Sequence, residues 1–88
     1  MEYKIAEKIA HRTLESEVVV LNLQNGLYYV LNETASKIWE WLFVSKKSIT
    51  KVISSLASEY HIDDKEMLKK DLDEQLDFWL KENLIEKA

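Results

Sequence analysis

Asn-Gly-Leu-Tyr-Tyr-Val-Leu-Asn-Glu-Thr-Ala-Ser-Lys-Ile-Trp, residues 25–39, carries the signals of a turn, a strand and a helix in direct succession. Asn25-Gly26 is typical of a two-residue hairpin turn, because both residue types tolerate the positive φ angles of a type I′ turn. The apolar run Leu27 to Leu31 then indicates a strand. Asn32 is a favourable helix N-cap, since its side-chain oxygen accepts a hydrogen bond from the first helical turn. This stretch therefore predicts a strand that passes into a helix across one residue.

Apolar residues that recur with the helical period predict three helices after this strand. Ser48 is the expected cap of the second helix, and Asp63 with Glu66 has the spacing of a capping box at the start of the third. Asn83 is the expected left-handed residue that ends the third helix, after which Leu84-Ile85 folds back on the core. The predicted buried positions are Ala35, Ile38, Trp39, Leu42 and Phe43, then Ile49, Val52, Ile53, Leu56, Ala57 and Tyr60, then Leu68, Leu72, Leu76, Trp79 and Leu80.

Strands are expected before these helices. Helix and strand patterns compete over residues 3–9, and we favour a first strand there because a hairpin follows. The β-branched run Val18 to Leu23 predicts the partner of the Leu27 to Leu31 strand. A two-residue loop would place Leu23 opposite Tyr28 and Leu21 opposite Val30. Both faces of this hairpin are apolar, so something besides the helices of the domain is expected to cover part of it. The order predicts a single α+β domain over residues 1–88, like a winged helix-turn-helix, with a three-stranded antiparallel sheet followed by three helices.

Composition limits the class of protein further. The chain has 88 residues, 47% of them hydrophobic, with no cysteine, no proline and one glycine, which is typical of one packed domain. No apolar run approaches the ~20 residues of a membrane span, and the N-terminus lacks the apolar core of a signal peptide. We therefore expect a cytoplasmic protein without a membrane association.

Few residues are suited to catalysis or to metal binding. The two histidines, His11 and His61, are far apart in the sequence and lie in expected turn or connecting positions. Neither a glycine-rich phosphate loop nor a nucleophile elbow is present. The carboxylates of the third helix are expected to form a solvated face rather than an acid/base pair. The sequence predicts no enzyme, no metal site and no cofactor.

Nucleic-acid binding is the usual role of a winged helix, and a DNA-binding regulator is therefore the alternative from another class. Such proteins need basic residues facing phosphates. This chain has a formal net charge of −4 and one arginine. The third helix carries Asp71, Asp73, Glu74 and Asp77 in its middle. The charge pattern argues against nucleic acid as a partner.

Binding of a peptide or protein is the class of function that the sequence favours once catalysis and nucleic-acid binding are disfavoured. The strand Leu27 to Leu31 is the last of the meander, so we expect it at a sheet edge, where unpaired backbone groups are a template for an added strand. A second stripe on the third helix, Met67, Asp71, Glu74 and Phe78, is not needed to close the core. The plainer alternative is that Tyr28 and Tyr29 are ordinary surface aromatics and that Met67 and Phe78 are peripheral core.

These residues together resemble the PqqD family, the leader-peptide-binding module often called the RiPP recognition element. One departure is Asn83, where the family commonly has glycine, and asparagine also adopts the left-handed conformation. The residues that carry the resemblance, over roughly Arg12 to Glu86, are Val18 to Leu23, Asn25-Gly26, Tyr28 to Asn32, Ala35, Ile38-Trp39, Leu42, Ile49, Ile53, Leu56, Tyr60, Asp71, Phe78, Leu80 and Leu84-Ile85.

The resemblance implies that the leader peptide of a ribosomally synthesised precursor binds as an extra strand beside the third helix. The chain would then be a non-catalytic adaptor, a monomer or weak homodimer, in natural product biosynthesis. Its enzyme partner would be the leader peptidase and cyclase of a lasso-peptide pathway, or alternatively a radical SAM enzyme. By position, the pairing edge would be Leu27, Tyr28, Tyr29, Val30 and Leu31, and the helix wall Met67, Asp71, Glu74, Gln75 and Phe78.

One hypothesis goes beyond the resemblance. Asp71 and Glu74 lie between two apolar side chains of the third helix, Met67 and Phe78. This pattern predicts a leader that presents a basic residue flanked by aromatic or aliphatic anchors.

Overall fold

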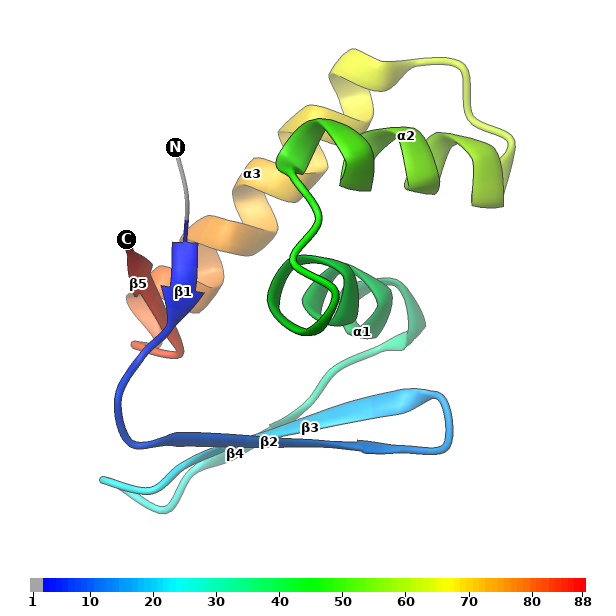
Figure 1. Ribbon diagram of the computed structural model, residues 1–88. Coiled ribbons are helices and arrows are strands. Elements are labelled where there is room, and N and C mark those ends of the chain that lie inside the picture. The colour runs from blue at the N-terminus through cyan, green and yellow to red at the C-terminus, as the bar shows by residue number, and fades with distance from the viewer. Residues whose placement is uncertain (1–2) are drawn as a thin grey trace.

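The structure is a computed structural model that describes residues 3–88, so Met1 and Glu2 lie outside the described residues. Strands β2 (Ile9–Leu14), β3 (Glu17–Asn22) and β4 (Tyr28–Val30) form an antiparallel sheet in the order β2-β3-β4 (Figure 1). The helices follow this sheet in the chain. The expected α+β class, with a three-stranded antiparallel sheet and three helices, is confirmed.

The helices are α1 (Glu33–Trp39), α2 (Ile49–Tyr60) and α3 (Lys65–Lys81), and a π-helical turn, η1 (Glu40–Val44), continues α1. Two predicted caps are confirmed.

Asn32 accepts a hydrogen bond of 2.8 Å from the Ala35 amide, and Ser48 accepts one of 3.2 Å from the Lys51 amide. The predicted cap of α3 is wrong by one residue. Asp64, rather than Asp63, lies before the first helical residue and accepts from the Met67 amide at 3.1 Å.

The two ends of the described chain form a second, smaller sheet. Asn83 has a left-handed φ of 60°, as expected, and this residue ends α3 and reverses the chain. Strand β5 (Ile85–Lys87) then pairs antiparallel with β1 (Tyr3–Ile5). The strand expected over residues 3–9 is therefore the short β1, which belongs to this smaller sheet. After a bend in which Lys8 has a φ of 64°, the first strand of the three-stranded sheet, β2, begins only at Ile9.

The β3–β4 turn differs from the expected two-residue hairpin. The backbone N–H of Asn22 donates to the Leu27 carbonyl at 2.8 Å, so four residues form the loop, and Leu21 pairs with Tyr28 instead of Val30. The cause is the Asn22 side chain, whose oxygen accepts from the amides of Gln24 and Asn25 and thereby closes a wider turn. The register has moved by two residues, so each paired side chain keeps the face that the pattern assigned to it.

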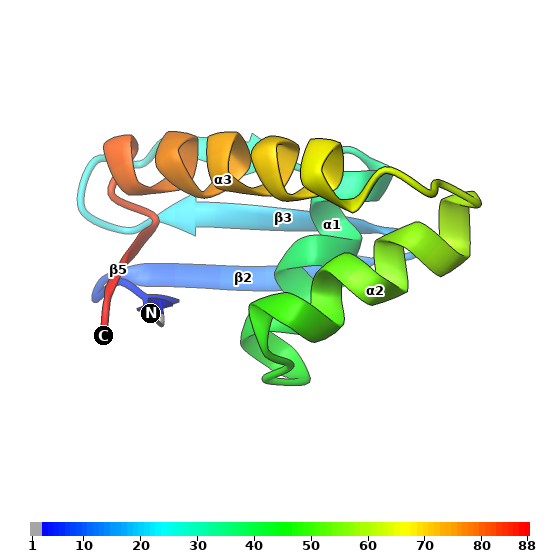
Figure 2. The same cartoon turned by 90° about the horizontal axis from the view of Figure 1, so that it is seen from above.

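All three helices lie on one side of the three-stranded sheet (Figures 1 and 2). We call this side the inner face, and its buried side chains include Val18, Val20 and Leu31. At the centre of the core, the rings of Trp39 and Trp79 meet edge to face with centroids 5.1 Å apart. The opposite, outer face of the sheet carries no helix.

Candidate functional site

The edge strands of the three-stranded sheet are β2 and β4, so β4 lies at a sheet edge as the sequence predicted. We call the β4 side the open edge. On its β3 side, the Leu27 carbonyl accepts from Asn22 and the Leu31 N–H donates to the Val18 carbonyl. Backbone groups of successive residues in an antiparallel ladder point alternately to the two sides. The N–H and C=O groups of Tyr28 and Val30 therefore point away from β3, toward the open edge.

The edge is shorter than the predicted stretch. Leu27 lies between the four-residue loop and β4, and Leu31 lies after β4 with 6% of its surface exposed. Both residues use their backbone groups toward β3, as described above. Leu31 is therefore part of the core, and the exposed backbone of the edge belongs to Tyr28 and Val30.

Helix α3 runs alongside this edge (Figure 2). The ring of Tyr29 meets the ring of Phe78 edge to face, with centroids 6.5 Å apart. The Tyr29 hydroxyl donates a hydrogen bond of 2.6 Å to Glu82 Oε1 at the end of α3. This hydrogen bond, together with burial and the negative charge of Glu82, raises the pKa of Tyr29 above its usual value of 10.0.

A shallow hollow of about 440 Å³ lies on α3 and is lined by Asp71, Glu74, Gln75 and Phe78. Their spacing of one and two helical turns places them on one face of α3. The Phe78 side chain is 48% exposed although it is large and apolar. Four of the five predicted wall residues therefore lie together, whereas the fifth, Met67, is exposed nearer the start of α3 and lines neither this hollow nor the cavity described next.

A second cavity, of about 320 Å³, lies between α1, α2 and α3 and shares Asp71 and Gln75 with the hollow. The two spaces are therefore neighbours on α3. Sequence reasoning did not assign the other lining residues to a site, because the pattern gave them only capping or core positions. They are Asn32, Thr34, Ala35, Ile38, Leu56, Tyr60, Ile62, Leu68 and Leu72.

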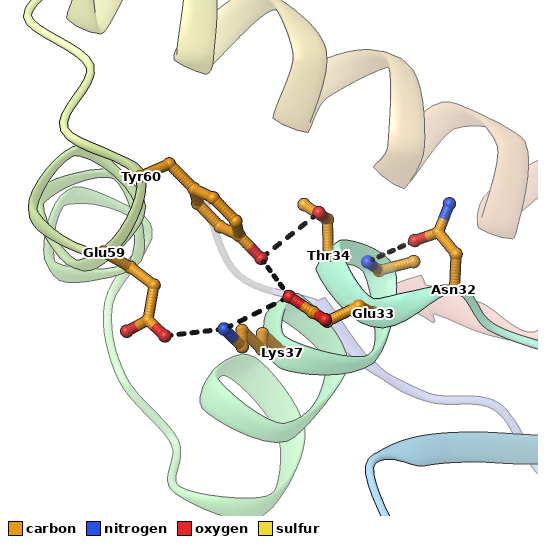
Figure 3. Close-up of polar contacts among 7 residues, drawn as sticks. Asn32, Glu33, Thr34, Lys37, Glu59 and Tyr60 are labelled. Atoms are coloured by element: carbon orange, nitrogen blue, oxygen red, sulfur yellow. Dashed lines mark hydrogen bonds and ion pairs between the residues drawn. The ribbon is translucent and has the colours of Figure 1, made fainter.

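Polar contacts between α1 and α2 hold one side of this cavity in place (Figure 3). The Tyr60 hydroxyl accepts from Thr34 and donates to Glu33, both at 3.3 Å. Lys37 binds Glu59 at 2.6 Å. Its hydrogen bond to Glu59 raises the pKa of Lys37, and the same contact lowers the pKa of Glu59. These contacts join α1 to α2 beside the cavity, whose lining includes Thr34 and Tyr60.

The site contains carboxylates, an amide and aromatic rings. Within residues 3–88, no group of three or more His, Cys, Asp or Glu side chains is arranged to hold a metal ion. His11 packs against the Trp39 ring, with centroids 5.7 Å apart, and His61 ends α2 with a left-handed φ of 53°. No helix in the described part of the chain is long and apolar enough to cross a membrane.

Comparison with known proteins gives two similar solved structures. One, described as TbiB1 in complex with the TbiA(beta) leader peptide, is 28% identical, with 97% of this chain and 96% of that chain covered and a TM-score of 0.88. The other, lasso peptide synthetase B1 complexed with the leader peptide, is 22% identical, with 98% and 99% covered and a TM-score of 0.87. The second likeness supports the fold alone.

The curated proteins contain no match to this sequence. The family model described as coenzyme PQQ synthesis protein D (PqqD) matches residues 17–85, which span β3 to the first residue of β5. This match includes the open edge, the hollow on α3, the cavity between the three helices and the turn at Asn83. The chain therefore belongs to the PqqD family.

Proposed function

We propose that this protein is a non-catalytic adaptor that binds the leader peptide of a ribosomally synthesised precursor and presents it to the enzymes that modify the precursor. The observation that carries the proposal is the open edge at Tyr28 and Val30 beside the hollow on α3. Support also comes from the 28% identical TbiB1, whose solved structure is described as a complex with a leader peptide.

The mode of binding is strand addition. A leader strand would form backbone hydrogen bonds with Tyr28 and Val30, and its side chains would alternate between the two faces of the extended sheet. Side chains on the inner face would meet Tyr29 and Phe78 and enter the hollow. Main-chain bonds give affinity in this mode, and the side-chain pockets give specificity.

The side chains that line the hollow suggest which leader residues would bind there. Asp71 and Glu74 are exposed, and the ion pairs within residues 3–88 do not include either residue. A basic leader residue would therefore find two carboxylates beside the apolar ring of Phe78. Apolar leader residues on either side of it would contact Phe78 and the wall of the cavity between α1, α2 and α3.

We favour the leader peptidase and cyclase of a lasso-peptide pathway as the enzymes, because one of the two similar solved structures is described as lasso peptide synthetase B1 complexed with the leader peptide. A radical SAM enzyme is the second candidate, because the matching family model is that of a coenzyme PQQ synthesis protein. Both precursor and enzymes would meet this adaptor in the cytoplasm. Joining them raises the effective concentration of the precursor without new chemistry.

The test is a titration with the synthetic leader of the precursor encoded beside this protein, followed by fluorescence anisotropy. A scrambled peptide of the same composition is the control, because it keeps charge and length. Micromolar or tighter binding of the leader alone supports the proposal. The proposal is contradicted if the leader and the scrambled peptide bind equally well. It is also contradicted if neither peptide binds even when the partner enzyme is present.

A further inference from the structure

Asn32 stands where the open edge ends and α1 begins. Leu31 still faces β3, because its N–H donates to the Val18 carbonyl, so the backbone N–H of Asn32 points to the open edge. The Asn32 backbone remains extended, with φ of −69° and ψ of 178°. Its carbonyl accepts from the Ser36 N–H at 2.8 Å, whereas its N–H forms no hydrogen bond with residues 3–88. The open edge therefore has one further donor beyond β4.

The side chain of Asn32 offers a second donor. Its Oδ1 accepts from the Ala35 N–H at 2.8 Å. Because a backbone N–H can only donate, the atom that faces it is the oxygen, and the other terminal atom is Nδ2. Figure 3 shows this nitrogen at the tip of the side chain, turned away from the first turn of α1. Asn32 is exposed and lines the cavity between α1, α2 and α3. Capping of α1 therefore uses only the oxygen of this amide.

Gln75 on α3 lines the same cavity and also the hollow. Its side chain is partly buried and forms no hydrogen bond with residues 3–88. A glutamine amide has an acceptor oxygen and two N–H donors, so it can bind either kind of main-chain group. The cavity therefore has an amide on its α1 side and another on its α3 side, whereas most of its other lining residues are apolar.

A leader strand that continues past Val30 needs partners of this kind. Each outward-facing residue of β4 offers an added strand both an N–H and a C=O group, but the carbonyl of Asn32 is already bound within α1. A main-chain group that is buried without a partner costs free energy. Nδ2 of Asn32 suits a leader carbonyl, and Oε1 of Gln75 suits a leader N–H. Side chains can thus continue the ladder where the strand stops.

We propose that Asn32 is a leader-positioning residue, whose backbone N–H and Nδ2 donate to main-chain carbonyls of the leader while Gln75 accepts a leader N–H. The inference rests on the proposed function, because it requires a leader strand on the β4 edge. These contacts hold the leader main chain over the cavity and do not depend on the leader side chains. Aspartate would cap α1 equally well, but it has no N–H group to donate.

The test separates this role from capping. Asn32→Asp keeps the shape and the capping oxygen but loses Nδ2, and Asn32→Ser keeps an uncharged cap with a shorter side chain. Ser48→Asp is the matched control, because it exchanges the cap of α2, which lines neither the hollow nor the cavity. Urea denaturation establishes that each variant is folded. Fluorescence anisotropy with the synthetic leader of the neighbouring precursor measures affinity at low and high salt, which isolates the effect of the added charge.

Both Asn32 variants should bind the leader at least about fivefold more weakly at both salt concentrations, and Ser48→Asp should stay within about twofold of the parent. In NMR spectra of the parent, the two side-chain N–H signals of Asn32 should shift and exchange more slowly when the leader binds. This second measurement does not depend on the folding of a variant.

Three results overturn the role of Asn32 in leader binding and leave it as a cap alone. The first is leader binding by both folded variants within about twofold of the parent. The second is a loss in Asn32→Asp that disappears at high salt while Asn32→Ser binds normally. The third is saturation of the parent with leader without a change in the Asn32 side-chain signals. Failure of the parent itself to bind the leader would instead overturn the proposed function.

Discussion

Tyr29 on β4 and Glu82 at the end of α3 are joined by a hydrogen bond of 2.6 Å. The two residues are far apart in the sequence, and their contact links the open sheet edge directly to the helix beside it. The same tyrosine ring packs against Phe78. One side chain therefore joins the two walls of the proposed leader-binding groove, which are the β4 edge and the α3 face that carries the hollow.

Removing this hydrogen bond should loosen the groove. Tyr29→Phe keeps the ring but loses the hydroxyl, and we expect a loss of about 1 kcal/mol in the free energy of unfolding, since Tyr29 is partly solvated. The raised pKa of Tyr29 means that its contribution is fully present below pH 10 and is lost as pH rises through the folded-state pKa. Urea denaturation of both proteins at pH 7 and near pH 11 checks this, and an equal difference at both pH values contradicts it.

Phe78 should be an anchor for the leader. Its ring is half exposed, so Phe78→Ala should change stability little but weaken leader binding by about 1 to 3 kcal/mol. Val44→Ala is the matched control, because Val44 is also an exposed apolar residue but lies on η1. Calorimetric titration measures both. Similar affinities for the two variants would remove Phe78 from the binding site.

The acidic lining should select a basic leader. Asp71→Ala and Glu74→Ala should each weaken leader binding by about 0.5 to 1 kcal/mol at low ionic strength, with a smaller effect in high salt, because exposed charge pairs are screened. Asp73→Ala is the control, since Asp73 is on the same helix but pairs with Lys69 and does not line the hollow. Affinities equal to the parent with the same salt dependence would exclude charge selection.

The open edge can be blocked without breaking the sheet. Proline has no N–H, and it is tolerated on an edge strand where that N–H points to solvent. Val30→Pro should therefore fold and lose leader affinity, by at least tenfold. Tyr29→Pro, whose N–H faces β3, should instead destabilise the β3–β4 pair. Parent-like leader binding by a folded Val30→Pro variant would argue against strand addition.

Local patterns predicted much of this structure. Interactions within a few residues determine the caps at Asn32 and Ser48 and the left-handed conformation of Asn83, and a sequence displays these directly. The edge position of β4 follows from its place as the last strand of the meander. The hydrophobic periodicity also placed the centre of the core, including Trp39 and Trp79, because burial on one face is what that periodicity encodes.

Other features depend on contacts that a local pattern does not contain. The register of the β3–β4 hairpin was wrong because the Asn22 side chain accepts two loop amides and favours a wider turn. The pairing of β1 with β5 was missed because it joins opposite ends of the chain. The cavity between the three helices depends on how the helices pack, so Tyr60 and Ile62 had no recognisable signal as site residues.

The most direct test of strand addition is amide hydrogen exchange followed by NMR, with and without the leader peptide. The account predicts that the amides of Tyr28 and Val30, which point to the open edge, become strongly protected when the leader binds. His11 and Thr13 are an internal control, because the ladder points their amides out from the other edge of the same sheet, and their exchange should not change. Protection at His11 and Thr13, or saturating leader binding that leaves Tyr28 and Val30 unprotected, would contradict binding at β4.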